Sequence, residues 1–150
     1  MTYLIFGIEF NQTVIFLPPS LTQLLFGCNF NQSIDSLPAT LTHLKFGDPF
    51  DPNWGGEFNQ PINSLPPVLT HLILGYYFDQ PIASLPSSLT HLALGTMFQQ
   101  EICSVLPPTL HHLEVKPDNY LHYQSLPYIS HICASRSNCI WCWDNFAYKV

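Results

Sequence analysis

The sequence repeats itself with a period of about 20 residues, and this repetition constrains the fold more than any other feature. The dipeptide Leu-Pro recurs with spacings of 20, 28, 20, 21 and 20 residues, and five of the seven glycines follow the same rhythm. The leucines of these dipeptides are Leu17, Leu37, Leu65, Leu85, Leu106 and Leu126. One short unit has therefore been copied about six times, and the longer spacing marks an insertion within residues 48–57.

One copy, residues 69–88, indicates what each unit forms. Leu72 and Leu74 alternate with Ile73, which is the period of a short strand with one buried face, and Gly75 ends that strand at a turn. A coil this short cannot cover its own apolar side chains, each of which contributes roughly 1.5–3 kcal/mol when buried. The covering must come from the coils above and below, so the sequence predicts a stacked solenoid.

The pattern L-x-x-L-x-L predicts a right-handed, leucine-rich-repeat-like, β-rich solenoid with a short parallel sheet of six to seven strands. Little or no helix is expected, because 14 prolines interrupt the chain. The predicted strands are residues 1–6, 21–26, 41–46, 69–74, 89–94, 110–115 and 129–134. We expect residues 1–134 to form the solenoid and residues 135–150 to form a C-terminal cap or tail.

Composition excludes several classes of partner. Only 9% of the residues are charged and the net charge is −6, with no basic cluster to neutralise phosphates, so neither nucleic acid nor a membrane is an expected partner. No apolar run approaches the roughly 20 residues of a membrane-spanning helix, and the first residues do not resemble a secretion signal. The number of cysteines, five, is odd and three of them crowd the C-terminus, which indicates reduced thiols and a cytoplasmic protein.

Residues 58–62 (Phe-Asn-Gln-Pro-Ile) and 78–82 (Phe-Asp-Gln-Pro-Ile), with Leu-Pro and Leu-Thr-His-Leu in fixed order, resemble the FNIP repeat. The resemblance covers residues 1–115 well and 116–134 poorly. FNIP-repeat proteins are abundant in social amoebae and in giant DNA viruses of amoebae, which implies the host cytoplasm if this chain is viral. Many members carry an F-box and receive substrates for ubiquitin ligases. Because Met1 already opens the first predicted strand, we expect no F-box here.

The asparagine that leucine-rich repeats usually place after the strand is missing, so other groups must satisfy the turn. The best candidates directly follow the repeated phenylalanine and fall in one file, where they can bond along the solenoid with about 0.5–1.5 kcal/mol per link. They are Asn11, Asn31, Asn59 and Asp79, followed by Gln12, Gln32, Gln60, Gln80 and Gln100. Nucleotide or sugar binding by these amides is the alternative.

Two rows of side chains are expected to point outward from the concave sheet. The first row is Tyr3, Gln23, His43, His71, His91, His112 and His131, and the second is Ile5, Leu25, Lys45, Ile73, Ala93, Glu114 and Cys133. At a strand spacing of about 4.8 Å, two imidazoles of the first row could share a zinc or copper ion. Alternatively, the rings stack as neutral groups that were copied with the repeat. Stacked rings resist simultaneous protonation, so acidification is then expected to strain the sheet.

The second row predicts a docking surface, because its apolar members would face water. Partial cover by neighbouring side chains is the alternative. The candidate binding residues on the concave face are Tyr3, Ile5, Leu25, His43, Lys45, His71, Ile73, His91, Ala93 and His112. Trp54, in the insertion, is a further candidate because tryptophan is enriched among residues that dominate interfaces. The insertion equally resembles a duplicated fragment, since Phe50-Asp51-Pro52 imitates the run at residues 78–81.

A second arrangement with metal-binding chemistry lies near the C-terminus. Cys139 and Cys142 have C-x₂-C spacing, and with His131 and Cys133 they could surround a zinc ion tetrahedrally. A single such pair without a matching second pair is a weak signal. We therefore expect no metal and no other cofactor.

Catalysis is not expected, because glycines occur singly, carboxylates are sparse and the serines belong to a repeated turn. The sequence predicts a non-enzymatic protein–protein interaction scaffold with an unidentified protein partner. Self-association through the N-terminal edge is a second expected mode, because no coil covers that edge. The alternatives are a metal-binding protein and a decaying repeat duplicate without a function of its own.

Overall fold

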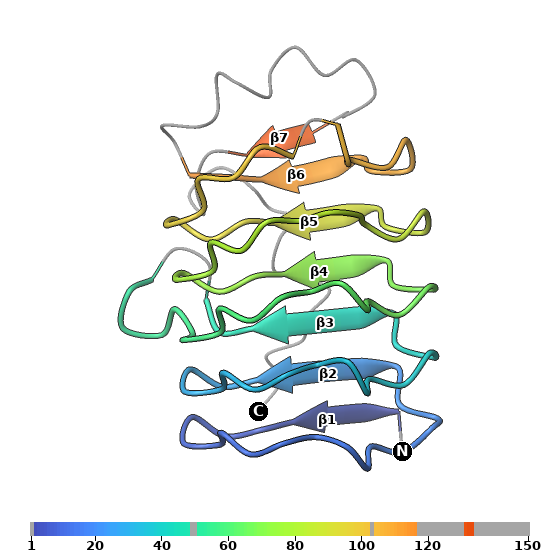
Figure 1. Ribbon diagram of the computed structural model, residues 1–150, viewed down its shortest axis with the longest axis vertical. Coiled ribbons are helices and arrows are strands. Elements are labelled where there is room, and N and C mark those ends of the chain that lie inside the picture. The colour runs from blue at the N-terminus through green and yellow to red at the C-terminus, as the bar shows by residue number, and fades with distance from the viewer. Residues whose placement is uncertain (1, 49–50, 103, 117–130, 134–150) are drawn as a thin grey trace.

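The computed structural model describes residues 2–48, 51–102, 104–116 and 131–133. Seven short parallel strands stack in chain order into one sheet (Figure 1). They are β1 (Tyr3–Ile5), β2 (Gln23–Phe26), β3 (His43–Phe46), β4 (His71–Ile73), β5 (His91–Ala93), β6 (His112–Glu114) and β7 (His131–Cys133). The predicted leucine-rich-repeat-like solenoid is confirmed, and the described residues contain no helix. It follows that nothing in this part of the chain forms a helix long and apolar enough to cross a membrane.

The register of the sheet places like residues of successive coils side by side. Leu24 is paired with Leu44, Leu44 with Leu72, and Leu72 with Leu92. All four leucines are buried. The predicted stacking of the coils is therefore confirmed in the interior, where these leucines form vertical files.

The strands are shorter than the predicted six residues, because each coil is still turning when the predicted strand begins. Leu41 donates its N–H to the carbonyl of Pro38 at 3.1 Å, which closes a turn. The N–H groups of Thr42 and His43 then both donate to the carbonyl of Thr22, at 2.8 and 3.1 Å. Two successive donors on one acceptor are incompatible with the alternating bonds of a strand. The first two residues therefore belong to the turn in the predicted strands 21–26, 41–46, 69–74, 89–94 and 110–115.

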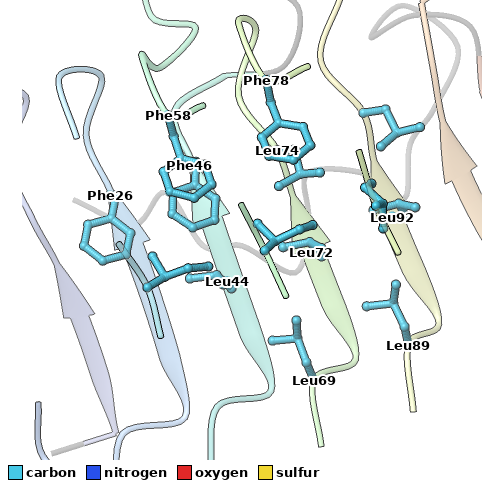
Figure 2. Packing of buried hydrophobic residues seen from close by; sticks show 14 of the residues in the cluster. Phe26, Leu44, Phe46, Phe58, Leu69, Leu72, Leu74, Phe78, Leu89 and Leu92 are labelled. Atoms are coloured by element: carbon cyan, nitrogen blue, oxygen red, sulfur yellow. The ribbon is translucent and has the colours of Figure 1, made fainter. Parts of the chain in front are cut away.

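Stacked phenylalanines form the thickest part of the core. One column contains Phe10, Phe30, Phe58, Phe78 and Phe98, with ring centroids 6.0–6.1 Å apart in successive coils. Within a coil a second ring lies closer, as where Phe46 stacks on Phe58 at 3.8 Å. Figure 2 shows the rings of Phe46, Phe58 and Phe78 above Leu44 and Leu72 of the leucine files. Because Phe30, Phe58 and Phe78 are covered by the coils on either side, no coil has a separate interior.

The repeated glycine follows from the same close stacking. A Cβ atom at Gly95 would collide with the backbone carbonyl of Gly75 in the preceding coil. A Cβ atom at Gly27 would similarly collide with the carbonyl of Gly7. The turns after the strands thus pack backbone against backbone, and a side chain would force the coils apart.

We expect Phe58→Ala to lower the free energy of unfolding by about 3–5 kcal/mol, because it leaves a cavity between Phe30 and Phe78. Urea unfolding followed by circular dichroism measures this loss. The matched control is Tyr77→Ala, which removes an exposed ring and should cost less than about 1 kcal/mol. Equal losses for the two variants would contradict the role given to the phenylalanine column.

Candidate functional site

The register confirms the two predicted rows on the sheet. In the first row, Gln23 is paired with His43, and His43, His71, His91 and His112 follow in successive strands. In the second row, Leu25 is paired with Lys45, and the pairing continues through Ile73 and Ala93 to Glu114. The row positions were thus predictable from the repeat.

Three histidines of the first row form a tight stack. The ring centroids of His43 and His71 are 4.2 Å apart, and those of His71 and His91 are 4.1 Å apart, with planes inclined by about 10°. The ring of His112 continues the stack at 5.4 Å and is tilted by 27°. All of them occupy the position that follows the repeated threonine, except His112, which follows His111.

A threonine ladder holds the first three rings. The hydroxyl of Thr70 donates to the carbonyl of Thr42 at 3.0 Å, and its oxygen lies 2.9 Å from Nδ1 of His71. Thr42 and Thr90 repeat this arrangement with His43 and His91. The threonine hydroxyl has one hydrogen, and this hydrogen must lie between the hydroxyl oxygen and the carbonyl oxygen, because two oxygens 3.0 Å apart would otherwise repel each other. The imidazole therefore carries its proton on Nδ1 and donates it to the threonine.

Burial and mutual proximity keep these rings neutral. Burial, the largest cause, acts together with the neighbouring His43, His91 and His112, in that order, to lower the pKa of His71 from its ordinary 6.5 to about 3. The pKa values of His43 and His91 are also lowered, chiefly by burial. Protonation of a ring would add its second proton at Nε2 and would leave the hydrogen bond from Nδ1 to threonine in place. The ring therefore resists protonation because it is buried and because a neighbouring protonated histidine would repel its charge.

We expect the protein to lose stability as the pH falls from about 7.5 to about 5. The unfolded chain binds protons below its ordinary histidine pKa of 6.5, whereas folded His71 stays neutral down to about 3. The stability that depends on neutral rings is therefore complete above pH 6.5 and is lost progressively below it. Thermal unfolding at the two pH values measures the effect.

The control for this prediction is a variant with glutamine at positions 43, 71 and 91, because Gln23 already occupies the same row. Its thermal midpoint should depend less on pH over this range. A wild-type midpoint that stays constant between the two pH values would contradict the prediction.

The stacked geometry does not favour a shared metal ion. Rings in nearly parallel planes direct their Nε2 lone pairs in parallel, so two neighbours do not converge on one ion. Within the described part of the chain, no group of three or more potential ligands is arranged to hold a metal. Of the alternative ligands, Cys139 and Cys142 lie outside the described residues, and for His131 and Cys133 only the backbone in β7 is described.

The expectation that the second row faces water is wrong for most of its members. Leu25 and Lys45 have exposed fractions of only 9% and 3%, and Ala93 and Glu114 are buried as well. Ile73 is half-buried, and Ile5 keeps 49% of its surface exposed, the only exposed side chain among the row members whose burial the structure describes. Ile5 has a neighbour on one side only, whereas side chains inside the row are flanked on both sides at strand spacing. The row is therefore not an open apolar strip.

The first row is partly covered too. Tyr3 is exposed at the edge of the sheet, and His43, His71 and His91 are half-buried. His112 is buried. The repeat therefore predicts where each residue lies on the sheet, but it does not predict how far neighbouring residues bury its side chain.

The insertion forms a loop that closes on itself. The N–H of Asp48 donates to the carbonyl of Trp54 at 2.7 Å, and the N–H of Asp51 donates to Oδ1 of Asp48 at 3.1 Å. After the loop, Glu57 donates to the carbonyl of Cys28 as its counterparts do in other coils, so residues 48–55 are the added ones. The described part of the loop extends beyond neighbouring turns (Figure 1), and 54% of Trp54 is exposed.

Two further exposed apolar side chains lie beside this loop. The N–H of Tyr76 donates to the carbonyl of Gly55, next to Trp54, and the N–H of Met97 donates to the carbonyl of Tyr76 at 3.0 Å. Tyr77 and Met97 are both exposed. We call Trp54, Tyr77 and Met97 the turn ridge. Sequence reasoning missed the last two as contacts, although apolar residues there replace the Glu9 and Asn29 of earlier coils.

The predicted amide ladder is confirmed. The side-chain oxygen of Asn31 accepts the backbone N–H of Asn59 and the Nε2 group of Gln60, both at 3.0 Å. The same two bonds are made by Asn11, Asn59 and Asp79 to the following coil. These oxygens are therefore engaged within the solenoid, which supports a structural role.

We expect Asn59→Ala to destabilise the fold by about 1–3 kcal/mol, because it leaves the N–H of Asp79 and the amide of Gln80 without their acceptor. Asn59→Asp retains an oxygen acceptor, as Asp79 does naturally, and should keep more of the stability than Asn59→Ala, although the new carboxylate repels that of Asp79 in the next coil. Urea midpoints of the two variants measure the difference. A similar loss in both would show that the acceptor is not the important feature.

Comparison with known proteins assigns the family. A family model described as FNIP Repeat matches residues 10–49, 58–96 and 82–116. The chain belongs to the FNIP-repeat family. No curated protein gives a significant match.

A solved structure that resembles this FNIP-repeat chain is described as that of CroV588, a novel circular LRR protein. It has 38% sequence identity and a TM-score of 0.48. The similarity covers 77% of this chain and 24% of that chain. The present chain thus spans about a quarter of the length of that protein.

Proposed function

We propose that this chain is a non-enzymatic scaffold that binds another protein, and that the turn ridge is its main contact surface. What supports the proposal is the position of three large apolar side chains on one side of adjacent coils. Backbone bonds between Gly55, Tyr76 and Met97 hold the ridge on a stacked core. Tryptophan, tyrosine and methionine are enriched in interfaces, and a rigid support limits the entropy lost on binding.

The charge of the surface favours a cationic partner. The described residues carry eight acidic and two basic side chains. Asp48 and Glu114 among the acids and Lys45 among the bases are buried, which leaves six acids and one base at the surface. Asp51 and Glu57 belong to the region of the insertion. A partner with basic residues around an apolar patch would complement this surface, and added salt would weaken the association.

The proposal extends to a viral protein that engages host proteins in the cytoplasm of an amoeba. What supports this part is the occurrence of FNIP-repeat proteins in giant DNA viruses of amoebae, together with the odd number of cysteines. The non-enzymatic character is supported by the repetition itself, because an active site needs unlike groups that converge once.

Affinity capture from amoeba cytosol tests the ridge. We expect Trp54→Ala and Tyr77→Ala to reduce the amount of a specifically captured protein at least about tenfold, as contact residues at the centre of an interface do. Val68→Ala, which truncates an exposed apolar side chain away from the ridge, is the matched control. Quantitative mass spectrometry of the captured proteins provides the measurement, and circular dichroism verifies folding.

Ile73→Asp tests the concave sheet in the same experiment. If capture is lost only in this variant, the sheet rather than the ridge is the binding surface. Captures that are equal for wild type and all variants would contradict the proposal.

A further inference from the structure

Exposed apolar side chains gather on the first coil, residues 2–20. Five of the nine large apolar residues that the described structure leaves exposed belong to it. They are Tyr3, Ile5, Ile8, Ile15 and Phe16. Leu4 and Phe6 are only partly buried, whereas Leu24 and Phe26 in the next coil are buried. The apolar files of the solenoid therefore end in an open face.

The backbone of β1 has one unpaired edge. Thr2 accepts N–H groups from Thr22 and Gln23, and Phe6 donates to Leu25, so these residues turn their polar groups toward β2. Backbone groups alternate in direction along a parallel strand. The N–H and C=O groups of Tyr3 and Ile5 thus point away from β2, where no described strand lies.

The first coil lacks the features that usually protect an edge strand. Such edges commonly carry charged side chains, proline or a bulge. Residues 2–20 contain one charged residue, Glu9, and its carboxylate accepts a bond from Asn29 inside the molecule. The prolines of the coil, Pro18 and Pro19, lie in the turn before β2 and not in β1. A nearly uncharged apolar face neither repels an identical face nor selects an oppositely charged partner.

We propose that β1 pairs in antiparallel fashion with β1 of a second copy of this chain, so that two solenoids form a symmetric dimer. A two-fold axis between the two Leu4 residues sets Tyr3 opposite Ile5 of the partner subunit. These residues then exchange both of their N–H to C=O bonds, and the reciprocal pair repeats the exchange. The contact is closed by symmetry, and the exposed side chains of Tyr3 and Ile5 cover one another on the concave face.

An antiparallel pair explains the edge better than a stack of copies in the same direction. The polar groups of Tyr3 and Ile5 alternate as donors and acceptors, which an identical strand matches when it runs the opposite way. A two-fold contact also stops at two copies, whereas a head-to-tail contact continues into a filament unless the rotation closes a ring.

Sedimentation equilibrium of the full chain tests the dimer, with reductant present because the chain has five cysteines. We expect twice the chain mass of 17.1 kDa at micromolar concentration. Ile5→Pro removes a donor that points away from β2 and is tolerated at an edge strand, so it should give the monomer mass with an unchanged circular dichroism spectrum. Ile5→Lys should raise the dissociation constant at least about tenfold, whereas Val68→Lys, an equivalent change elsewhere, should not.

Cross-linking tests the orientation. In a background with the natural cysteines replaced by serine, Tyr3→Cys and Ile5→Cys chains should form a disulfide when mixed but not when each is alone. Hydrogen-bonded antiparallel partners have Cα atoms about 5.5 Å apart, which suits a disulfide. A monomeric wild type, a dimer that survives Ile5→Pro, or the absence of the mixed cross-link would each overturn the proposal.

Discussion

The structure depends on burial that is shared between coils. A turn of about 20 residues encloses no interior, so each leucine and phenylalanine is covered by its equivalents in the neighbouring coils. Leu44 lies between Leu24 and Leu72, and Phe58 lies between Phe30 and Phe78. The requirement explains why Gly27, Gly75 and Gly95 must lack a side chain, since the same contacts bring backbones together at the turns. Loss of one contact therefore weakens two coils.

The same stacking imposes a rule on polar side chains. A group that recurs in every coil has its own copy for a neighbour, so repeated charges would repel along the whole file. Asparagine suits such a file because its oxygen accepts bonds from the next coil while the ladder remains almost uncharged. Histidine suits it only as a neutral ring, and the threonine beside each of the first three rings supplies the acceptor for Nδ1. The low pKa of His71 is thus a consequence of the repeat.

Function is expected where the repeat is broken. The added residues 48–55 bring Trp54 outward, and Tyr77 and Met97 replace polar residues of the earlier coils. The first coil is the other break, because among the described residues no further coil covers its apolar side chains or pairs with its strand edge. The two regions lie on different coils and serve different proposals: the turn ridge for a foreign protein and β1 for a second copy. Residues that repeat faithfully, such as the asparagines, are engaged in holding the solenoid together.

The sequence by itself determined the coils, their register, the amide ladder and the row that contains the histidines. Periodicity was sufficient for these features, because an equal spacing along the chain brings Leu44 to Leu72 and Asn31 to Asn59 in any stacked arrangement. Only the tertiary structure decided where the strands begin, which ring nitrogen of the stacked histidines carries the proton and which side chains are buried. Leu25 and Ile5 occupy equivalent positions in the repeat, yet one is buried and the other exposed. The exposure of a side chain depends on which residues surround it in space. Where the repeat ends or is interrupted, the spacing of residues along the chain does not predict those neighbours.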